Sequence, residues 1–215
     1  MNKHFLTITP VAIVLGIMGC CNISILTILA GKSTYFGLSN MVMPALAAVS
    51  GIGSIILMTM YVILKSGSAT LAITKGLPTL AAIYSAQCTA PSWRSKMLNI
   101  GIPVTAAAAF VLHPVGNAAW VYSLFWVVPV FGELLRSFGV TSLFNRLLTA
   151  TFVAHAIGSV MWLYLVPTTP ATWMALLTIV PAERLVFASG ATLIAMVIGV
   201  MRNYALAGIK KIRTS

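Results

Sequence analysis

The chain has 215 residues, of which 60% are hydrophobic and 7% are charged, and its mean hydropathy is +1.01. A chain of this composition cannot cover itself with a water-compatible surface, so an ordinary soluble domain is excluded. The formal net charge of +11 does not indicate nucleic-acid binding, because the 13 Lys and Arg residues are scattered between apolar runs rather than gathered on one face. We therefore predict an all-α polytopic membrane protein, with residues 1–215 forming a single transmembrane domain.

The N-terminal part of the chain predicts the first two of about six transmembrane helices, since each span needs about 20 apolar residues. Residues 1–30 have a basic start and an apolar run that is too long for a signal peptide, so we expect an uncleaved helix. The alternative is a lipoprotein cleavage box at "IMGC", which Met18 suits poorly. Met41 to Leu64 is the second span, and its small residues would let another helix approach closely.

The stretch from residue 66 to residue 96 is the hardest to place. Lys75, Gly76 and Pro78 interrupt it and leave a short apolar segment. Such a segment suits a re-entrant or broken helix at 69–88, which is tolerated at membrane depth only where protein or a cavity shields its backbone. If it crossed fully instead, the span count would be seven.

The second half of the chain predicts the remaining spans. Pro and Gly in "HPVGN", residues 113–117, predict a turn, and "TTPATW" predicts another. Between and after these turns we expect spans at 97–112, 118–135 and 147–166, and either one long broken helix or an interfacial helix followed by a span over 171–201, with Pro181 as the break.

The basic residues predict the orientation, because short cytoplasmic loops gather Lys and Arg. With six spans, both termini inside and residues 66–96 dipping in from the inner side, all but Lys32 and Arg184 are cytoplasmic. The cytoplasmic basic residues are then Lys3, Lys65, Lys75, Arg94, Lys96, Arg136, Arg146, Arg202, Lys210, Lys211 and Arg213. We expect a multi-pass protein of a bacterial inner membrane.

Polar residues inside the spans are the functional candidates, since such groups are costly in lipid and usually face a cavity or another helix. His155, Ser159 and Trp162 follow one another at helical spacing and would share one face of the fifth span. The alternative is a core histidine that bonds to a neighbouring carbonyl.

A second group of candidates lies near the outer turn. His113, Asn117 and Trp120 repeat the polar and aromatic spacing, and Tyr122 and Trp126 continue an aromatic face into the next span. Together these side chains would form a pocket that stacks a flat ring and hydrogen-bonds its edge. The alternative is that the Trp and Tyr residues anchor the helices at the membrane interface.

The only acidic residues in the chain are Glu133 and Glu183. Glu183 is followed by Arg184 in an apolar stretch, and adjacent residues point about 100° apart on a helix. One interpretation is therefore that the two side chains find separate partners, Glu183 meeting His155 or a ligand and Arg184 holding an anionic group of a substrate. The alternative is structural, with Glu183 in the first turn of a helix and Arg184 snorkelling outward.

Catalysis and cofactor binding find little support in the sequence. The absence of Asp excludes intramembrane aspartyl proteases, and there is no HExxH motif and no Gly-rich phosphate loop. Cys20, Cys21 and Cys88 lack zinc-site spacing, so we expect no metal and no cofactor. A Ser/His dyad made from Ser159 or Ser189 with a histidine is the enzyme alternative.

The size, the six-span layout and the small-residue faces "ALAAVSGIG" and "TAAAAF" resemble the S components of energy-coupling-factor vitamin transporters. The resemblance is one of architecture, and "HPVG" and "KGLPT" match no vitamin-specific subfamily. It implies a subunit that binds a small organic nutrient and takes energy from a transmembrane coupling protein and ATPase subunits. The alternatives are a stand-alone proton-coupled carrier using Glu183, and a membrane assembly factor.

Overall fold

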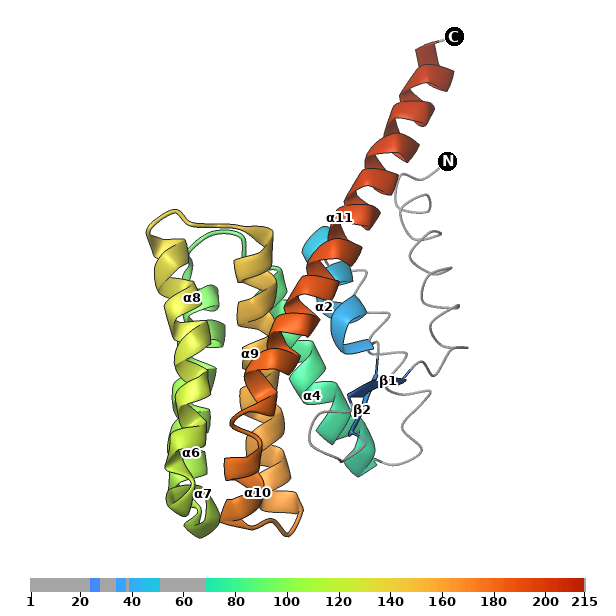
Figure 1. The fold of residues 1–215 in the computed structure, drawn as a ribbon. Coiled ribbons are helices and arrows are strands. Elements are labelled where there is room, and N and C mark those ends of the chain that lie inside the picture. Colours follow the sequence, from blue (N-terminus) through green and yellow to red (C-terminus); the bar gives the residue numbers. More distant parts are fainter. Residues whose placement is uncertain (1–23, 28–33, 38, 51–68, 215) are drawn as a thin grey trace.

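The computed structural model describes residues 24–27, 34–37, 39–50 and 69–214. Helices make up nearly all of this part of the chain (Figure 1). They are α2 (Ser39–Ser50), α4 (Ala69–Ala86), α5 (Trp93–Lys96), η1 (Met97–Gly101), α6 (Ile102–Leu112), α7 (Pro114–Ala118), η2 (Trp120–Trp126), α8 (Val127–Ser137), α9 (Leu143–Leu165), α10 (Pro170–Ala175) and α11 (Ile179–Thr214). The predicted helical class is confirmed at this level.

Two short strands are an exception to the helical fold. β1 (Ser24–Thr27) pairs antiparallel with β2 (Thr34–Gly37), and Ile25 lies opposite Phe36. β1 falls within the predicted first helix, so that prediction is wrong for these four residues. β-branched and aromatic residues have a high strand propensity, and the sequences of both segments contain them. Residues 1–23, and the second half of the span predicted for Met41 to Leu64, lie outside the described residues.

Helix α9 is the centre of the bundle, because α2, α4, α6, α8 and α11 all pack against it. Two apolar clusters lie around it. One joins α9 to α2, α4 and α11 through small and aliphatic residues such as Ala82, Leu147 and Ala191. The other joins α9 to α6, η2 and α10 and is rich in aromatic residues, including Phe110 and Trp173.

Helix α4 differs from the predicted re-entrant or broken segment at 69–88. It is one continuous α-helix with Pro78 inside it. It runs antiparallel to α9, since Ala86 packs in the same cluster as Leu147 while Pro78 lies beside Gly158. Eighteen residues span about 27 Å. The prediction of a broken helix is therefore wrong for this segment, and a re-entrant position in the membrane stays a prediction.

Three helical segments are long and apolar enough to cross a membrane among the described residues. They are Trp93–Leu112, Leu143–Leu165 and Ile179–Tyr204. These correspond to the predicted third, fifth and last spans, and the count of six spans is not confirmed. The segment predicted to span 118–135 is divided between the 3-10 helix η2 and the α-helix α8.

Pro181 lies near the start of the last helix, α11. α10 ends at Ala175, and α11 begins at Ile179 and continues without interruption to Thr214. Pro181 therefore lies in the first turn of α11, where a missing N–H costs nothing, and it does not break the helix. α11 extends beyond the rest of the bundle at the end where the 138–142 connection lies (Figure 1).

Candidate functional site

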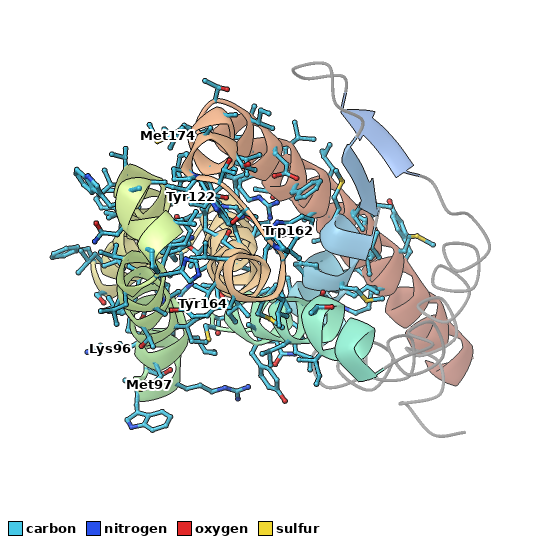
Figure 2. The ribbon with its side chains drawn as sticks, turned by 90° about the horizontal axis from the view of Figure 1, so that it is seen from below. Lys96, Met97, Tyr122, Trp162, Tyr164 and Met174 are labelled. Carbon is cyan, nitrogen blue, oxygen red and sulfur yellow. The ribbon has the colours of Figure 1, made fainter. Side chains whose placement is uncertain are left out.

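A polar group lies inside the aromatic half of the bundle, between η2 and α9. The Tyr122 hydroxyl is 3.0 Å from Nε2 of His155 and 3.4 Å from Oγ of Ser159. His155 and Ser159 are one turn apart on α9, so both point toward η2. Tyr122 is almost fully buried, and its hydroxyl links the two helices. Figure 2 shows Tyr122 between the green and the orange helices.

Aromatic rings pack around the side chain of Tyr122. The Tyr122 ring stacks on Phe110 of α6 at 5.5 Å and meets Trp173 of α10 edge-on at 4.8 Å. Phe110 also meets Trp126 edge-on at 5.4 Å. These rings pack on one another in the aromatic cluster, and the Tyr122 hydroxyl is a polar group inside it.

Glu183 and Arg184 lie close to this aromatic group, at the start of α11. Arg184 Nη2 is 2.8 Å from Oε2 of Glu183, so the prediction of separate partners is wrong for these two side chains. The length of both side chains overcomes the 100° between their Cα–Cβ bonds. Arg184 Nη1 also donates a long hydrogen bond to the Thr151 carbonyl on α9, and the guanidinium lies over the Phe187 ring. No hydrogen bond or ion pair joins Glu183 to His155 in the described part of the chain.

Three buried polar atoms of this region have no hydrogen-bond partner. They are Nε1 of Trp126, Oε1 of Glu183 and Nε of Arg184. Arg184 reaches the Thr151 carbonyl, one turn before His155 on α9, which places the pair near the Tyr122 group. Buried polar atoms are nearly always satisfied in native proteins, so unpartnered ones need an explanation.

The structure brings six of the ten predicted site residues into this region: Tyr122, Trp126, His155, Ser159, Glu183 and Arg184. The other four lie elsewhere. His113 caps α7 by accepting from the Val115 N–H and packs on Tyr164, and the exposed Asn117 donates to the Val111 carbonyl. Trp120 and Trp162 are half exposed.

Trp162 misses the site because of helix geometry. It follows Ser159 by three residues, a rotation of about 300°, whereas Leu163 follows by four and comes closer to the buried face. Leu163 is accordingly buried, while 57% of Trp162 is exposed. Trp162 therefore lies on the outer surface of the bundle and not in the site.

A second buried polar network was missed in the sequence. Ser95 Oγ donates to Oε1 of Glu133 at 2.5 Å, and Asn99 Nδ2 donates to Oε2 at 2.9 Å. Arg136 also donates to Oε2 of Glu133, and Ser85 donates to Oδ1 of Asn99 at 2.6 Å. Asn99 lies in the π-helical turn η1, and such turns are frequent at functional sites. Ser85 and Asn99, which are polar residues within apolar segments, were the available signal.

Close packing holds the Glu133 network in place. A Cβ at Gly132 would come within 2.1 Å of Thr149 Oγ1, so only glycine allows α8 to approach α9 this closely. At the N-terminal side, Ser92 and Ser95 form a reciprocal capping box that begins α5. The network therefore ties together α4, η1 and α8.

Neither polar group has the composition of a metal centre. Among the described residues, no three His, Cys, Asp or Glu side chains gather in one place. The enzyme alternative gains no geometric support from α9, because Ser159 bonds to Tyr122 and no Ser–His hydrogen bond occurs in the described chain.

Comparisons with protein-family models, with curated proteins and with solved structures gave no match for this chain.

Proposed function

We propose that the protein is a membrane subunit that binds a small, ring-containing organic nutrient and passes it inward. The observation that carries the proposal is the Tyr122 hydroxyl, which sits between His155 and Ser159 inside a wall of aromatic rings. The rings would stack on a flat ligand, and the polar atoms would recognise its edge.

The unpartnered atoms suggest the chemistry of the ligand. Trp126 Nε1 and Arg184 Nε are free donors, and Glu183 Oε1 is a free acceptor. A ligand with an acceptor group, such as a carboxylate or ring carbonyl, and a donor group would satisfy all three. Glu183 holds the Arg184 guanidinium in one orientation, and its Nε–H would then donate to the acceptor group of the ligand.

The energy source distinguishes two versions of the proposal. In the first, the chain works like an S component and takes energy from a transmembrane coupling protein and ATPase subunits. In the second, it is a proton-coupled carrier, and Glu183 is the coupling group. The second version has a specific observation in its favour, since one oxygen of the buried Glu183 has no partner while both oxygens of Glu133 are bonded.

The experiment that tests the proposal is native mass spectrometry of gently purified protein, followed by thermal unfolding against a library of vitamins and heterocyclic metabolites. We expect a retained small molecule that raises the unfolding temperature. No ligand-dependent shift anywhere in the library would contradict the proposal and favour a membrane assembly factor.

Liposomes containing the purified chain separate the two versions. Uptake driven by a proton gradient, and lost in Glu183→Gln, would support the stand-alone carrier. Ligand binding without uptake by the isolated chain would support the partner-driven subunit.

A further inference from the structure

Arg136 and Arg146 lie at the end of the bundle opposite α7 and α10, outside the proposed nutrient site. Arg136 is in the last turn of α8, and Arg146 is in the first turn of α9. The connections at 87–92 and 138–142 lie at this same end (Figure 1). Their residues are mostly exposed, so a ligand can reach this end without crossing the core.

Each of the two guanidinium groups has a buried nitrogen without a partner, Nη2 of Arg136 and Nε of Arg146. The side chain of Arg136 is 2% exposed. It uses Nη1 for Glu133, and Arg146 has only a 3.4 Å contact from Nη2 to the Ala48 carbonyl. An unsatisfied buried guanidinium nitrogen is costly, because the charge is desolvated without compensation.

No acidic side chain can neutralise Arg146. The chain has two acidic residues, and each already has an arginine partner, Glu133 with Arg136 and Glu183 with Arg184. Gly132 of α8 lies against Thr149 of α9. Arg136 follows Gly132 by one turn and Arg146 precedes Thr149 by about one turn, so the antiparallel packing of α8 and α9 brings the two arginines together at this end. Like charges held together in this way call for an anion between them.

We propose that Arg136 and Arg146 form a binding site for a phosphate group. A guanidinium presents its N–H donors in a planar fork that matches phosphate oxygens. The N-terminal end of α9 points to the same place, and its helix dipole adds to the attraction.

The position of Arg146 favours the phosphate of a lipid headgroup. Arg146 is in the first turn of Leu143–Leu165, one of the segments long and apolar enough to cross a membrane, so it lies at headgroup level when that helix crosses. Basic sites between helices at this level bind anionic phospholipids. A soluble phosphate compound is the other source of the same chemistry.

Thermal unfolding of delipidated protein in a neutral detergent tests the site. One arm compares phosphatidylglycerol with phosphatidylcholine, and the other compares inorganic phosphate with chloride at equal ionic strength. We expect phosphatidylglycerol to raise the unfolding midpoint by about 5 °C relative to phosphatidylcholine. A shift with inorganic phosphate alone would assign the site to a soluble ligand, and no shift in either arm would overturn the proposal.

Variants distinguish a site from general charge attraction. Arg146→Gln should weaken phosphatidylglycerol binding at least about tenfold. Arg136→Lys should also weaken phosphatidylglycerol binding. This variant keeps a positive charge beside Glu133, so it can be used if Arg136→Gln does not fold. The matched control is Lys96→Gln, which removes one exposed charge near the same end. An equal loss in Lys96→Gln would overturn the proposal.

Discussion

Glu183 and Arg184 are neighbours in the chain and form an ion pair, with 2.8 Å between Oε2 and Nη2. The two side chains depend on each other unequally. Arg184 also contacts the Thr151 carbonyl and the Phe187 ring, whereas Glu183 has no other partner in the described part of the chain and its Oε1 is unsatisfied. Removing one partner therefore has a different consequence from removing the other.

We expect Arg184→Gln to destabilise the protein more than Glu183→Gln. Arg184→Gln leaves a buried carboxylate without its cation, which costs about 3 kcal/mol or more. Glu183→Gln leaves Arg184 with its remaining partners and costs about 1 kcal/mol. Thermal unfolding of both variants in one detergent measures the difference, and the reverse order would show that Arg184 does not stabilise Glu183.

We expect Glu133→Gln to be strongly destabilising, by about 3–5 kcal/mol, because it leaves Arg136 buried and unpaired. The N–H groups of the new side-chain amide would also face the N–H donors of Asn99 and Arg136, which need an acceptor at this position. The double variant Glu133→Gln/Arg136→Met removes both charges and should recover part of the loss. If the double variant is as unstable as Glu133→Gln, the unpaired charge is not the cause.

We expect Gly132→Ala to cost about 1–3 kcal/mol, because the added Cβ would overlap Thr149 Oγ1 and push α8 away from α9. Gly199→Ala in α11 is the matched control. A Cβ at Gly199 meets nothing within 4 Å, and alanine favours the helix by up to about 1 kcal/mol. Equal unfolding temperatures for the two variants would contradict the close approach of α8 and α9.

We expect Tyr122→Phe to reduce nutrient binding and to cost about 1–2 kcal/mol of stability, since it leaves His155 and Ser159 without the hydroxyl between them. Trp120→Phe changes an exposed aromatic residue two positions away and serves as the control. Isothermal titration with the retained ligand measures binding. Equal affinities in the two variants would remove the Tyr122 hydroxyl from the site.

We expect the Cys88 thiol to react slowly at neutral pH. Burial raises the pKa of this thiol, and the charges of Arg136 and Arg94 only partly oppose the effect. The thiolate is the reactive form. The rate of alkylation by iodoacetamide should therefore rise with pH, and the pH of half-maximal rate should lie above the pKa of free cysteine. The measurement uses a Cys20→Ser/Cys21→Ser background, and a midpoint below that of free cysteine would contradict the burial argument.

The candidate site could be predicted in part from local spacing. His155 and Ser159 share a face of α9 because they are one helical turn apart, and that follows from sequence separation alone. Their meeting with Tyr122 joins residues more than 30 positions apart, and no local rule predicts such a contact. The Glu133 network was missed for the same reason, since Ser95 and Asn99 precede Glu133 by 38 and 34 positions.

The sequence by itself determined that the protein is helical and apolar enough for a membrane, because hydropathy and residue spacing act along the chain. It also determined that only two carboxylates compete for 13 basic residues. The two ion pairs are local, because Glu133 and Arg136 are three residues apart on α8 and Glu183 and Arg184 are adjacent on α11. Tertiary structure alone decided that Ser95 and Asn99 reach Glu133 across helices, and that Arg146 keeps a buried nitrogen without a partner, because these outcomes depend on how helices far apart in the chain pack together.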